Sequence, residues 1–165
     1  MPDPGFAVEL DLPFACQAGA PTPALRHGSL LLLRVVNLFD SHDAEGSRDQ
    51  ERVEARLDLM LHWLGMQLFG AEPMPPSQPL RLENDRITWP GAAPSEGDAV
   101  TLRLHIHPGL PAPLFLGGRV VERADGHTVA VLSFDDDKQA DAWSQWLFRQ
   151  HRRAVQEARK RNGPD

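Results

Sequence analysis

Cysteine is nearly absent from this chain of 165 residues, which contains only Cys16. One cysteine excludes a disulfide framework and a zinc site built on cysteine ligands, and it is typical of a reducing compartment. Long hydrophobic runs are missing too, because the longest uncharged apolar run, near residues 30–33, is far too short to cross a bilayer. The N-terminus has no basic segment before an apolar run, so we expect no signal peptide and a cytoplasmic location.

Positive charge is in short supply, with 17 basic against 23 acidic side chains and a net charge of −6. This balance argues against a general nucleic-acid binder. The segment 149–161 is the exception, because Glu157 is its only acidic residue. Its basic residues are Arg149, Arg152, Arg153, Arg159, Lys160 and Arg161. This segment is suited to attract phosphates or an acidic partner protein, and the alternative is a solvated helix end.

Proline is missing from residues 24–72 and 114–163, although the chain has 15 prolines. Because proline is excluded from helix interiors and central strands, these two windows should contain the longest regular elements. Residues 6–12 alternate between apolar and polar and predict a short edge strand, and the Ala-, Pro- and Gly-rich residues 13–29 predict a loop. Residues 30–39 fit a helix or a strand, and we favour the helix.

The clearest element of the first window is a helix predicted for residues 47–69, with Ser47 or Asp49 as its N-cap. Its second half is apolar around most of its circumference, so it must be buried on more than one side. Four leucines follow the 4-3-4 spacing of a coiled-coil seam: Leu57, Leu61, Leu64 and Leu68. We expect this helix to mediate self-association, and the alternative is a central core helix packed on the sheet.

After the proline-rich linker 71–79 the periodicity changes to two, which predicts strands at 80–89, 98–107, 114–122 and 127–134. The strand at 98–107 alternates cleanly. Its inward residues are Val100, Leu102, Leu104 and Ile106, and its outward residues are Thr101, Arg103, His105 and His107. We expect a bulge at Gly117 and Gly118 and a hairpin turn at Asp125 and Gly126. The spacing of these strands predicts an antiparallel sheet or a small barrel.

The second window ends in a helix predicted for residues 136–161. Asp135 or Asp136 can cap it, and the basic residues of its last turn complement the helix dipole. An apolar stripe should lie on the barrel, and its members are Ala140, Trp143, Leu147 and Ala154.

The residue patterns of a catalytic or metal site are missing as well. No serine lies in a G-x-S-x-G frame, and no glycine-rich loop for phosphates occurs. His105 and His107 share a strand face without a further ligand at a suitable spacing, so we expect solvated histidines. Helix capping explains the acidic residues 135–137 better than a divalent ion does. We therefore expect that the protein is not an enzyme and that it contains neither a metal ion nor a resident cofactor.

Four segments occur in a particular order. The leucine-rich segment RVEARLDLMLHWLGMQL precedes the strand GDAVTLRL at 97–104, which is followed by PLFLGGRVV at 113–121 and WLFRQHRRAV at 146–155. This order resembles the atypical, tetramer-forming branch of the PilZ family of cyclic di-GMP receptor domains, over residues 30–161. The resemblance implies a mainly β fold, an antiparallel barrel with a closing C-terminal helix and an added long helix that drives tetramer assembly.

The resemblance implies that the chain forms one atypical PilZ domain, residues 1–165. The N-terminal strand and loop take residues 6–29, and the helical insert with the oligomerisation helix takes 30–70. The barrel strands take 80–134, and the closing helix takes 136–161.

The resemblance also implies a ligand, because PilZ domains bind cyclic di-GMP through an R-x-x-x-R segment and a (D/N)-x-S-x-x-G motif. Residues 70–80 contain no arginine here. In the second motif the Ser position is Arg86 or Ile87, and the Gly position is Trp89 or Pro90. We expect the usual surface to be lost, with Arg86 and Trp89 filling the space of a guanine. A non-standard site is the alternative, and its candidates are Arg81, Asn84, Asp85, Arg86, Arg149, Arg152 and Arg153.

The sequence therefore predicts a non-enzymatic signalling module of the cyclic di-GMP network. It would act through oligomerisation and protein contacts in motility, biofilm or virulence regulation, as the resemblance implies. The alternative is a structural assembly protein without a nucleotide ligand. We expect other copies of the chain as partners, in a tetramer or a dimer, together with a signalling protein, and neither membrane insertion nor nucleic acid.

Overall fold

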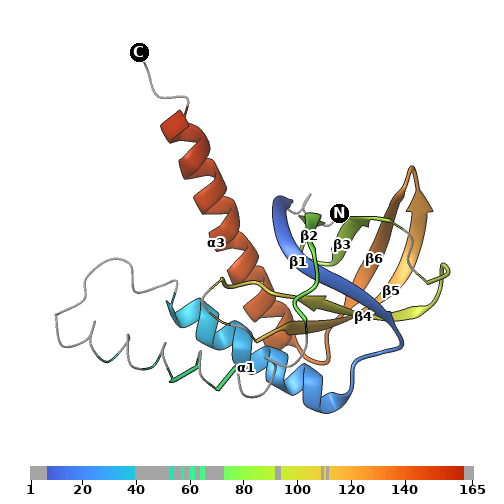
Figure 1. The fold of residues 1–165 in the computed structure, drawn as a ribbon, viewed down its shortest axis with the longest axis horizontal. Helices are drawn as coiled ribbons and strands as arrows, with labels where there is room; N and C mark the ends of the chain where they lie inside the picture. The colour runs from blue at the N-terminus through green and yellow to red at the C-terminus, as the bar shows by residue number, and fades with distance from the viewer. Residues whose placement is uncertain are drawn as a thin grey trace.

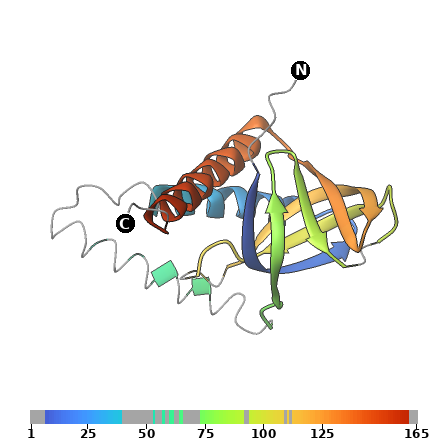
Figure 2. The ribbon, with the colours of Figure 1, turned by 90° about the horizontal axis from the view of Figure 1, so that it is seen from above.

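The computed structural model describes residues 7–39, 73–91, 94–108, 110 and 112–161. It also describes six separate residues of the segment between the first two ranges, all helical: Val53, Leu57, Met60, Leu61, Leu64 and Gly65. The other residues of the helix predicted for 47–69 lie outside the described residues. Six strands form a closed barrel, and two long helices cross beside it (Figure 1, Figure 2).

The elements follow one another as predicted for a mainly β chain with helices. They are β1 (Val8–Ala18), α1 (Pro23–Phe39), β2 (Ser77–Leu82), β3 (Arg86–Pro90), β4 (Ala99–Leu104), β5 (Leu114–Ala124), β6 (His127–Ser133) and α3 (Asp137–Arg161). Around the barrel the order is β1-β2-β3-β6-β5-β4, and every neighbouring pair is antiparallel. The predicted antiparallel barrel is confirmed.

β1 closes the barrel by pairing with two strands. Its residues 8–13 pair with β2, and its residues 14–18 pair with β4. The predictions of an edge strand at 6–12 and of a loop over 13–29 were therefore wrong. Pro13 lies where the pairing changes, and its carbonyl accepts a hydrogen bond from the His105 N–H at 3.1 Å. Pro23 is the first residue of α1, a position where the missing N–H of proline does no harm.

Two turns separate neighbouring strands. The strand predicted for 80–89 is in fact two strands, because the chain reverses at Asn84 and Asp85, and Glu83 N–H donates to Arg86 O at 2.9 Å. Both residues are common turn formers. The turn predicted at Asp125 and Gly126 is confirmed, since both have positive φ angles, of 53° and 77°, as a type I′ hairpin requires.

The glycine pair of β5 does not form the predicted bulge, because the irregularity lies between Val120 and Glu122. Gly117 and Gly118 serve a close approach instead. A Cβ atom on Gly118 would lie 3.0 Å from the carbonyl oxygen of Val131, and one on Gly117 would lie 2.8 Å from Ser133 Oγ.

The inward residues predicted for β4 and the segment after it are all buried in the barrel core. The outward residues Thr101, Arg103 and His105 are buried as well, which corrects the expectation of solvated strand histidines. The link between β1 and α1 covers Thr101, whose hydroxyl donates to Gly19 O at 2.8 Å. Both ring nitrogens of His105 are buried and meet no hydrogen-bond partner among the described residues.

α1 packs on β5, and α3 packs against α1. Ser29 Oγ of α1 accepts a hydrogen bond from Phe115 N–H at 2.8 Å, and Asn37 Nδ2 donates to Ala142 O of α3 at 2.9 Å. Asp136 caps α3 as predicted, because its Oδ1 accepts from Gln139 N–H at 2.9 Å.

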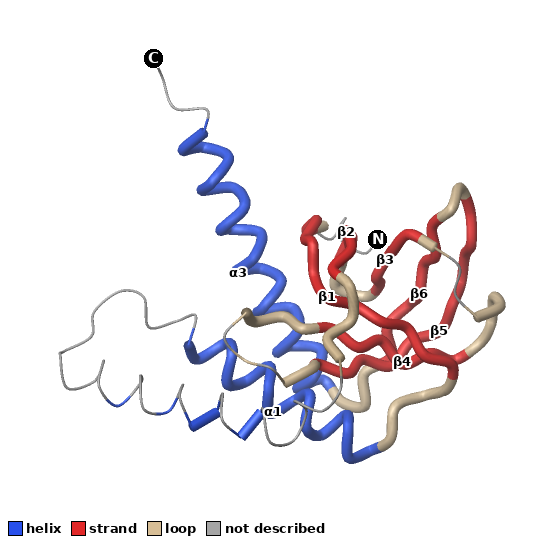
Figure 3. Tube along the Cα trace, in the orientation of Figure 1, coloured by secondary structure: helices blue, strands red, loops and turns tan. Residues whose placement is uncertain are grey.

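The stripe predicted on α3 is confirmed only in its first half. Trp143 and Leu147 are buried, whereas Ala154 is exposed. The reason is visible in Figure 1 and Figure 3, where the second half of α3 leaves the barrel and projects outward.

Exchanging Gly118 for alanine is expected to lower the free energy of unfolding by about 1–3 kcal/mol, since the added methyl group meets a backbone carbonyl that cannot move freely. The matched control is Gly28→Ala in α1, where a Cβ meets nothing within 4 Å. It should raise the free energy of unfolding by about 0.5–1 kcal/mol, because alanine favours the helix. Urea denaturation at one protein concentration measures both, and equal effects of the two substitutions would contradict this account.

Acid is expected to destabilise the protein through His105. Burial and the charge of Arg103 lower the pKa of His105 from its ordinary 6.5. As the pH falls through 6.5, the unfolded chain takes up a proton at this residue that the folded chain does not, so the free energy of unfolding decreases. His105→Leu should flatten this decrease relative to the wild type between about pH 7.5 and 5.5. Chemical denaturation across this range measures the slopes, and identical slopes would contradict the assignment.

Candidate nucleotide-binding surface

The seven candidate residues fall into two groups in the structure. Arg81, Asn84, Asp85 and Arg86 lie on and around the turn between β2 and β3. Arg149, Arg152 and Arg153 lie on α3. The turn itself rests against α3, because Trp143 Nε1 donates to the carbonyl oxygen of Glu83 at 3.1 Å.

Acidic neighbours neutralise the two arginines at the turn. Arg81 Nε donates to Glu83 Oε1 at 2.8 Å, and Arg86 Nη2 lies 3.2 Å from Asp85 Oδ2. Arg86 Nε is also 3.6 Å from Glu83 Oε2. The hydrogen bond to Asp85 and the charge of that carboxylate raise the pKa of Arg86 above its ordinary value.

These exposed ion pairs are individually weak, yet together they cancel the positive potential that a phosphate ligand would need. Glu83 lies outside the positions of the family motif, so the motif does not point to it. The available signal was the spacing of Glu83, which lies two residues after Arg81 and three before Arg86. Across a tight turn, this spacing brings the carboxylate close to both arginines.

Trp89 does not occupy the ligand face, contrary to the sequence prediction. β3 alternates, so Arg86 points outward whereas Ile87 and Trp89 point into the barrel. Trp89 is 3% exposed, and its ring centroid lies 5.3 Å from that of Phe14. Of the two residues expected to fill the space of a guanine, only Arg86 lies on the outer surface.

The basic residues of α3 do not form one uniform patch. Arg149 turns toward α1, where its Nη1 donates to the backbone carbonyl and, at 3.2 Å, to the side-chain oxygen of Asn37. Arg152 is exposed, and its guanidinium carbon lies 6.0 Å from the centroid of the Phe148 ring, in cation–π range. No local pattern points to Asn37, because it lies 112 residues before Arg149 in the chain.

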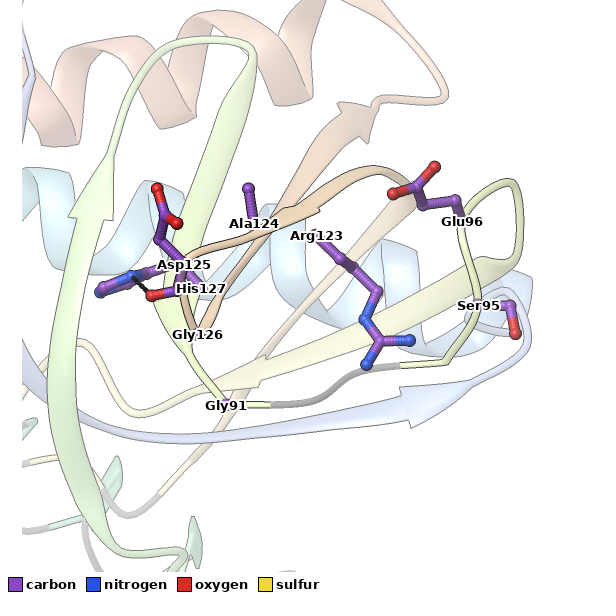
Figure 4. A pocket seen from close by; sticks show the side chains of 8 residues that line it. All are labelled: Gly91, Ser95, Glu96, Arg123, Ala124, Asp125, Gly126 and His127. Atoms are coloured by element: carbon purple, nitrogen blue, oxygen red, sulfur yellow. Dashed lines mark hydrogen bonds between the residues drawn. The ribbon is translucent and has the colours of Figure 1, made fainter.

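A wide hollow at the end of the barrel lies apart from all seven candidates. Its volume is about 760 Å³, and the β5–β6 hairpin and the loop before β4 line it (Figure 4). Among its described lining residues, Arg123 is the one cation against the carboxylates of Glu96 and Asp125, and His127 Nδ1 lies 3.1 Å from Asp125 O. These lining residues therefore leave one negative charge in excess, which does not suit a phosphate ligand.

Within the described part of the chain, no cluster of three or more histidine, cysteine, aspartate or glutamate side chains is arranged to hold a metal ion. Burial raises the pKa of the Cys16 thiol to about 11, so this cysteine is protonated at neutral pH. No helix among the described residues is long and apolar enough to cross a membrane.

The described helical residues between 53 and 65 have two faces. Four apolar side chains at 4-3-4 spacing are about half exposed or more: Val53, Leu57, Met60 and Leu64. Leu61 instead packs against the core, and Gly65 is buried. Of the four leucines predicted to form the seam, Leu57 and Leu64 thus lie on the exposed face and Leu61 on the inner one. Leu68 lies outside the described residues.

Comparison with known proteins places this geometry in context. Among solved structures, the chain is similar to a pathogenic protein from Xanthomonas campestris, described as a tetrameric PilZ domain that self-assembles through an unusual helical bundle. The two share 22% sequence identity over 92% of this chain and 91% of that chain, with a TM-score of 0.78, so the likeness establishes the fold. No curated protein matches the chain significantly. The family described as "Atypical PilZ domain, cyclic di-GMP receptor" matches residues 33–160. The chain therefore belongs to the atypical PilZ domain family.

Proposed function

We propose that this atypical PilZ domain is a non-enzymatic module of cyclic di-GMP signalling that works through self-association and protein contacts, without binding the nucleotide itself. The observation that carries the proposal is the neutralisation of Arg81 and Arg86 by Glu83 and Asp85. Family membership supports the signalling role, and motility, biofilm formation or virulence would be the processes it regulates.

The chemistry of the ligand supports the loss of binding at the β2–β3 turn. Cyclic di-GMP carries two phosphates, and guanidinium forks bind phosphate and carboxylate groups with the same bidentate geometry, so the two compete for one arginine. At this turn each arginine already has a carboxylate within 3.2 Å. A bound phosphate would have to displace that carboxylate and would then lie beside its negative charge.

The exposed face defined by Val53, Leu57, Met60 and Leu64 supports self-association. Its residues follow the spacing of a coiled-coil seam, and all four are apolar although about half exposed or more. Apolar side chains gathered on one face of a helix indicate a surface that a partner covers. The Xanthomonas campestris relative is described as assembling through a helical bundle, which is the arrangement that such a seam would form.

Self-association is tested by Leu57→Glu combined with Leu64→Glu. Two carboxylates per chain would enter an apolar interface, so the dissociation constant should rise by at least about a hundredfold, or roughly 2.7 kcal/mol. Sedimentation analysis should show a dimer or tetramer for the wild type and a monomer for the variant.

The matched control for the seam is Val121→Glu, which adds the same charge at a similarly exposed apolar residue on β5. It should leave the assembly intact. A monomeric wild type, or equal dissociation by the control, would show that the seam does not hold the assembly.

Nucleotide binding is tested by isothermal titration calorimetry of the full chain with cyclic di-GMP, with GTP as the control ligand. We expect no saturable binding of the wild type at micromolar concentrations. Glu83→Gln combined with Asp85→Asn should increase any residual affinity, because it releases both arginines from their ion pairs.

Micromolar binding by the wild type that Arg81→Ala or Arg86→Ala abolishes would overturn the proposal. Binding lost only in Arg149→Ala would overturn it as well and would assign the nucleotide to α3.

A further inference from the structure

A cleft between α1 and α3 has no part in the proposed function so far. Its volume is about 440 Å³, within the range of small binding pockets. Its polar lining consists of Arg34 and Asn37 from α1, and of Lys138, Asp141, Gln145 and Arg149 from α3. None of these residues belongs to the β2–β3 turn or to the apolar seam.

The cleft has an excess of positive charge in a chain that is acidic overall. Three cations line it against the single carboxylate of Asp141, whereas the whole chain has a net charge of −6. Arg34 and Lys138 are exposed, and among the described residues neither forms an ion pair. Their charges are therefore available to a ligand, unlike those of Arg81 and Arg86.

Arg149 is held in place on one side of the cleft. Asn37 is 7% exposed and is itself fixed by donating from Nδ2 to Ala142 O at 2.9 Å. Its two oxygens accept from Arg149 Nη1. The other N–H groups of this guanidinium make no hydrogen bond with described residues, so a pre-oriented donor remains for a ligand.

We propose that this cleft binds an acidic segment of a partner protein, with carboxylates on Arg34, Lys138 and Arg149. The inference rests on the proposed function, because it gives the chemistry of the protein contact through which the module would act. Guanidinium forks match carboxylates in geometry as well as in charge. The exposed Arg152 follows Arg149 on α3 and extends the positive potential that would steer such a segment to the cleft.

The other lining residues favour a peptide over a nucleotide or a polyphosphate. No aromatic side chain among the described lining residues offers a surface on which a base could stack. Asp141 would repel a dense run of phosphates, whereas its carboxylate and the side-chain oxygen of Gln145 can accept hydrogen bonds from peptide N–H groups. An acidic peptide offers both carboxylates for the three cations and backbone N–H groups for Asp141 and Gln145.

The test is the fluorescence anisotropy of a labelled hexaglutamate peptide with the full chain at low ionic strength. Arg34→Glu combined with Lys138→Glu should weaken binding at least about tenfold, because both charges become repulsive. The matched control, Arg159→Glu combined with Lys160→Glu, reverses the same number of charges at the far end of α3. It should change the affinity by less than about threefold, since exposed distant charges are screened.

Three outcomes would overturn the inference. They are the absence of peptide binding by the wild type, an equal loss in both double variants, and displacement of the peptide by inorganic phosphate as effective as that by unlabelled hexaglutamate. Thermal unfolding verifies that the variants are folded.

Sedimentation of each variant separates this inference from the proposed function. The altered residues lie outside the seam and the β2–β3 turn, so a normal assembly with lost peptide binding concerns the cleft alone. A monomeric wild type that still binds the peptide would contradict the proposed assembly and leave the cleft supported.

Discussion

β1 has to pair with both β2 and β4, because the barrel order β1-β2-β3-β6-β5-β4 closes only when the strands at its two ends, β1 and β4, pair with each other. The two halves of β1 divide this task at Pro13. The end of β1 then leads the chain directly over Thr101 and into α1, which Ser29 fixes on β5. α1 also supports features outside the barrel, because it packs against α3 and lines the groove that contains Leu61.

α1 therefore separates two surfaces of opposite chemistry. On one side an apolar groove of about 400 Å³ lies between α1, Leu61, Leu64 and the residues before β5. On the other side Arg34 and Asn37 face α3 and form the cationic cleft. The apolar side of α1 thus faces the segment that carries the seam, and its polar side faces the cleft proposed for an acidic partner.

Local patterns predicted the elements whose residues alternate or turn in a regular way. The inward residues of β4, the turn at Asp125 and Gly126, and the cap at Asp136 all depend on neighbours within a few positions, so the sequence contains their full signal. The proline content of residues 13–29 led to a wrong prediction, because two of these prolines occupy special positions in regular elements. Pro13 lies at a change of strand pairing and Pro23 at the start of a helix, whereas the proline-rich composition of residues 13–29 predicts a loop.

The candidate surface was harder to predict, because its chemistry depends on contacts across the fold. The sequence grouped Arg81 with Arg86, but the hairpin brings Glu83 close to both, and Asp85 pairs with Arg86. Trp89 was placed on the wrong face since the prediction of one long strand hid the register of β3. The contact between Arg149 and Asn37 joins residues 112 positions apart, and no local pattern contains it.

The projecting half of α3 has a consequence for the energetics of recognition. From Arg152 to Lys160 every residue is exposed, so this segment gains almost nothing from tertiary packing. A helix of about ten residues is marginal in water when it stands alone, and its order depends on the anchored turns that precede it. A partner that covers this half would shift its helix–coil equilibrium as it binds, and part of the binding free energy would be used to order the segment. Among the described elements, the exposed half of α3 is therefore a segment whose helix content would rise when a partner covers it.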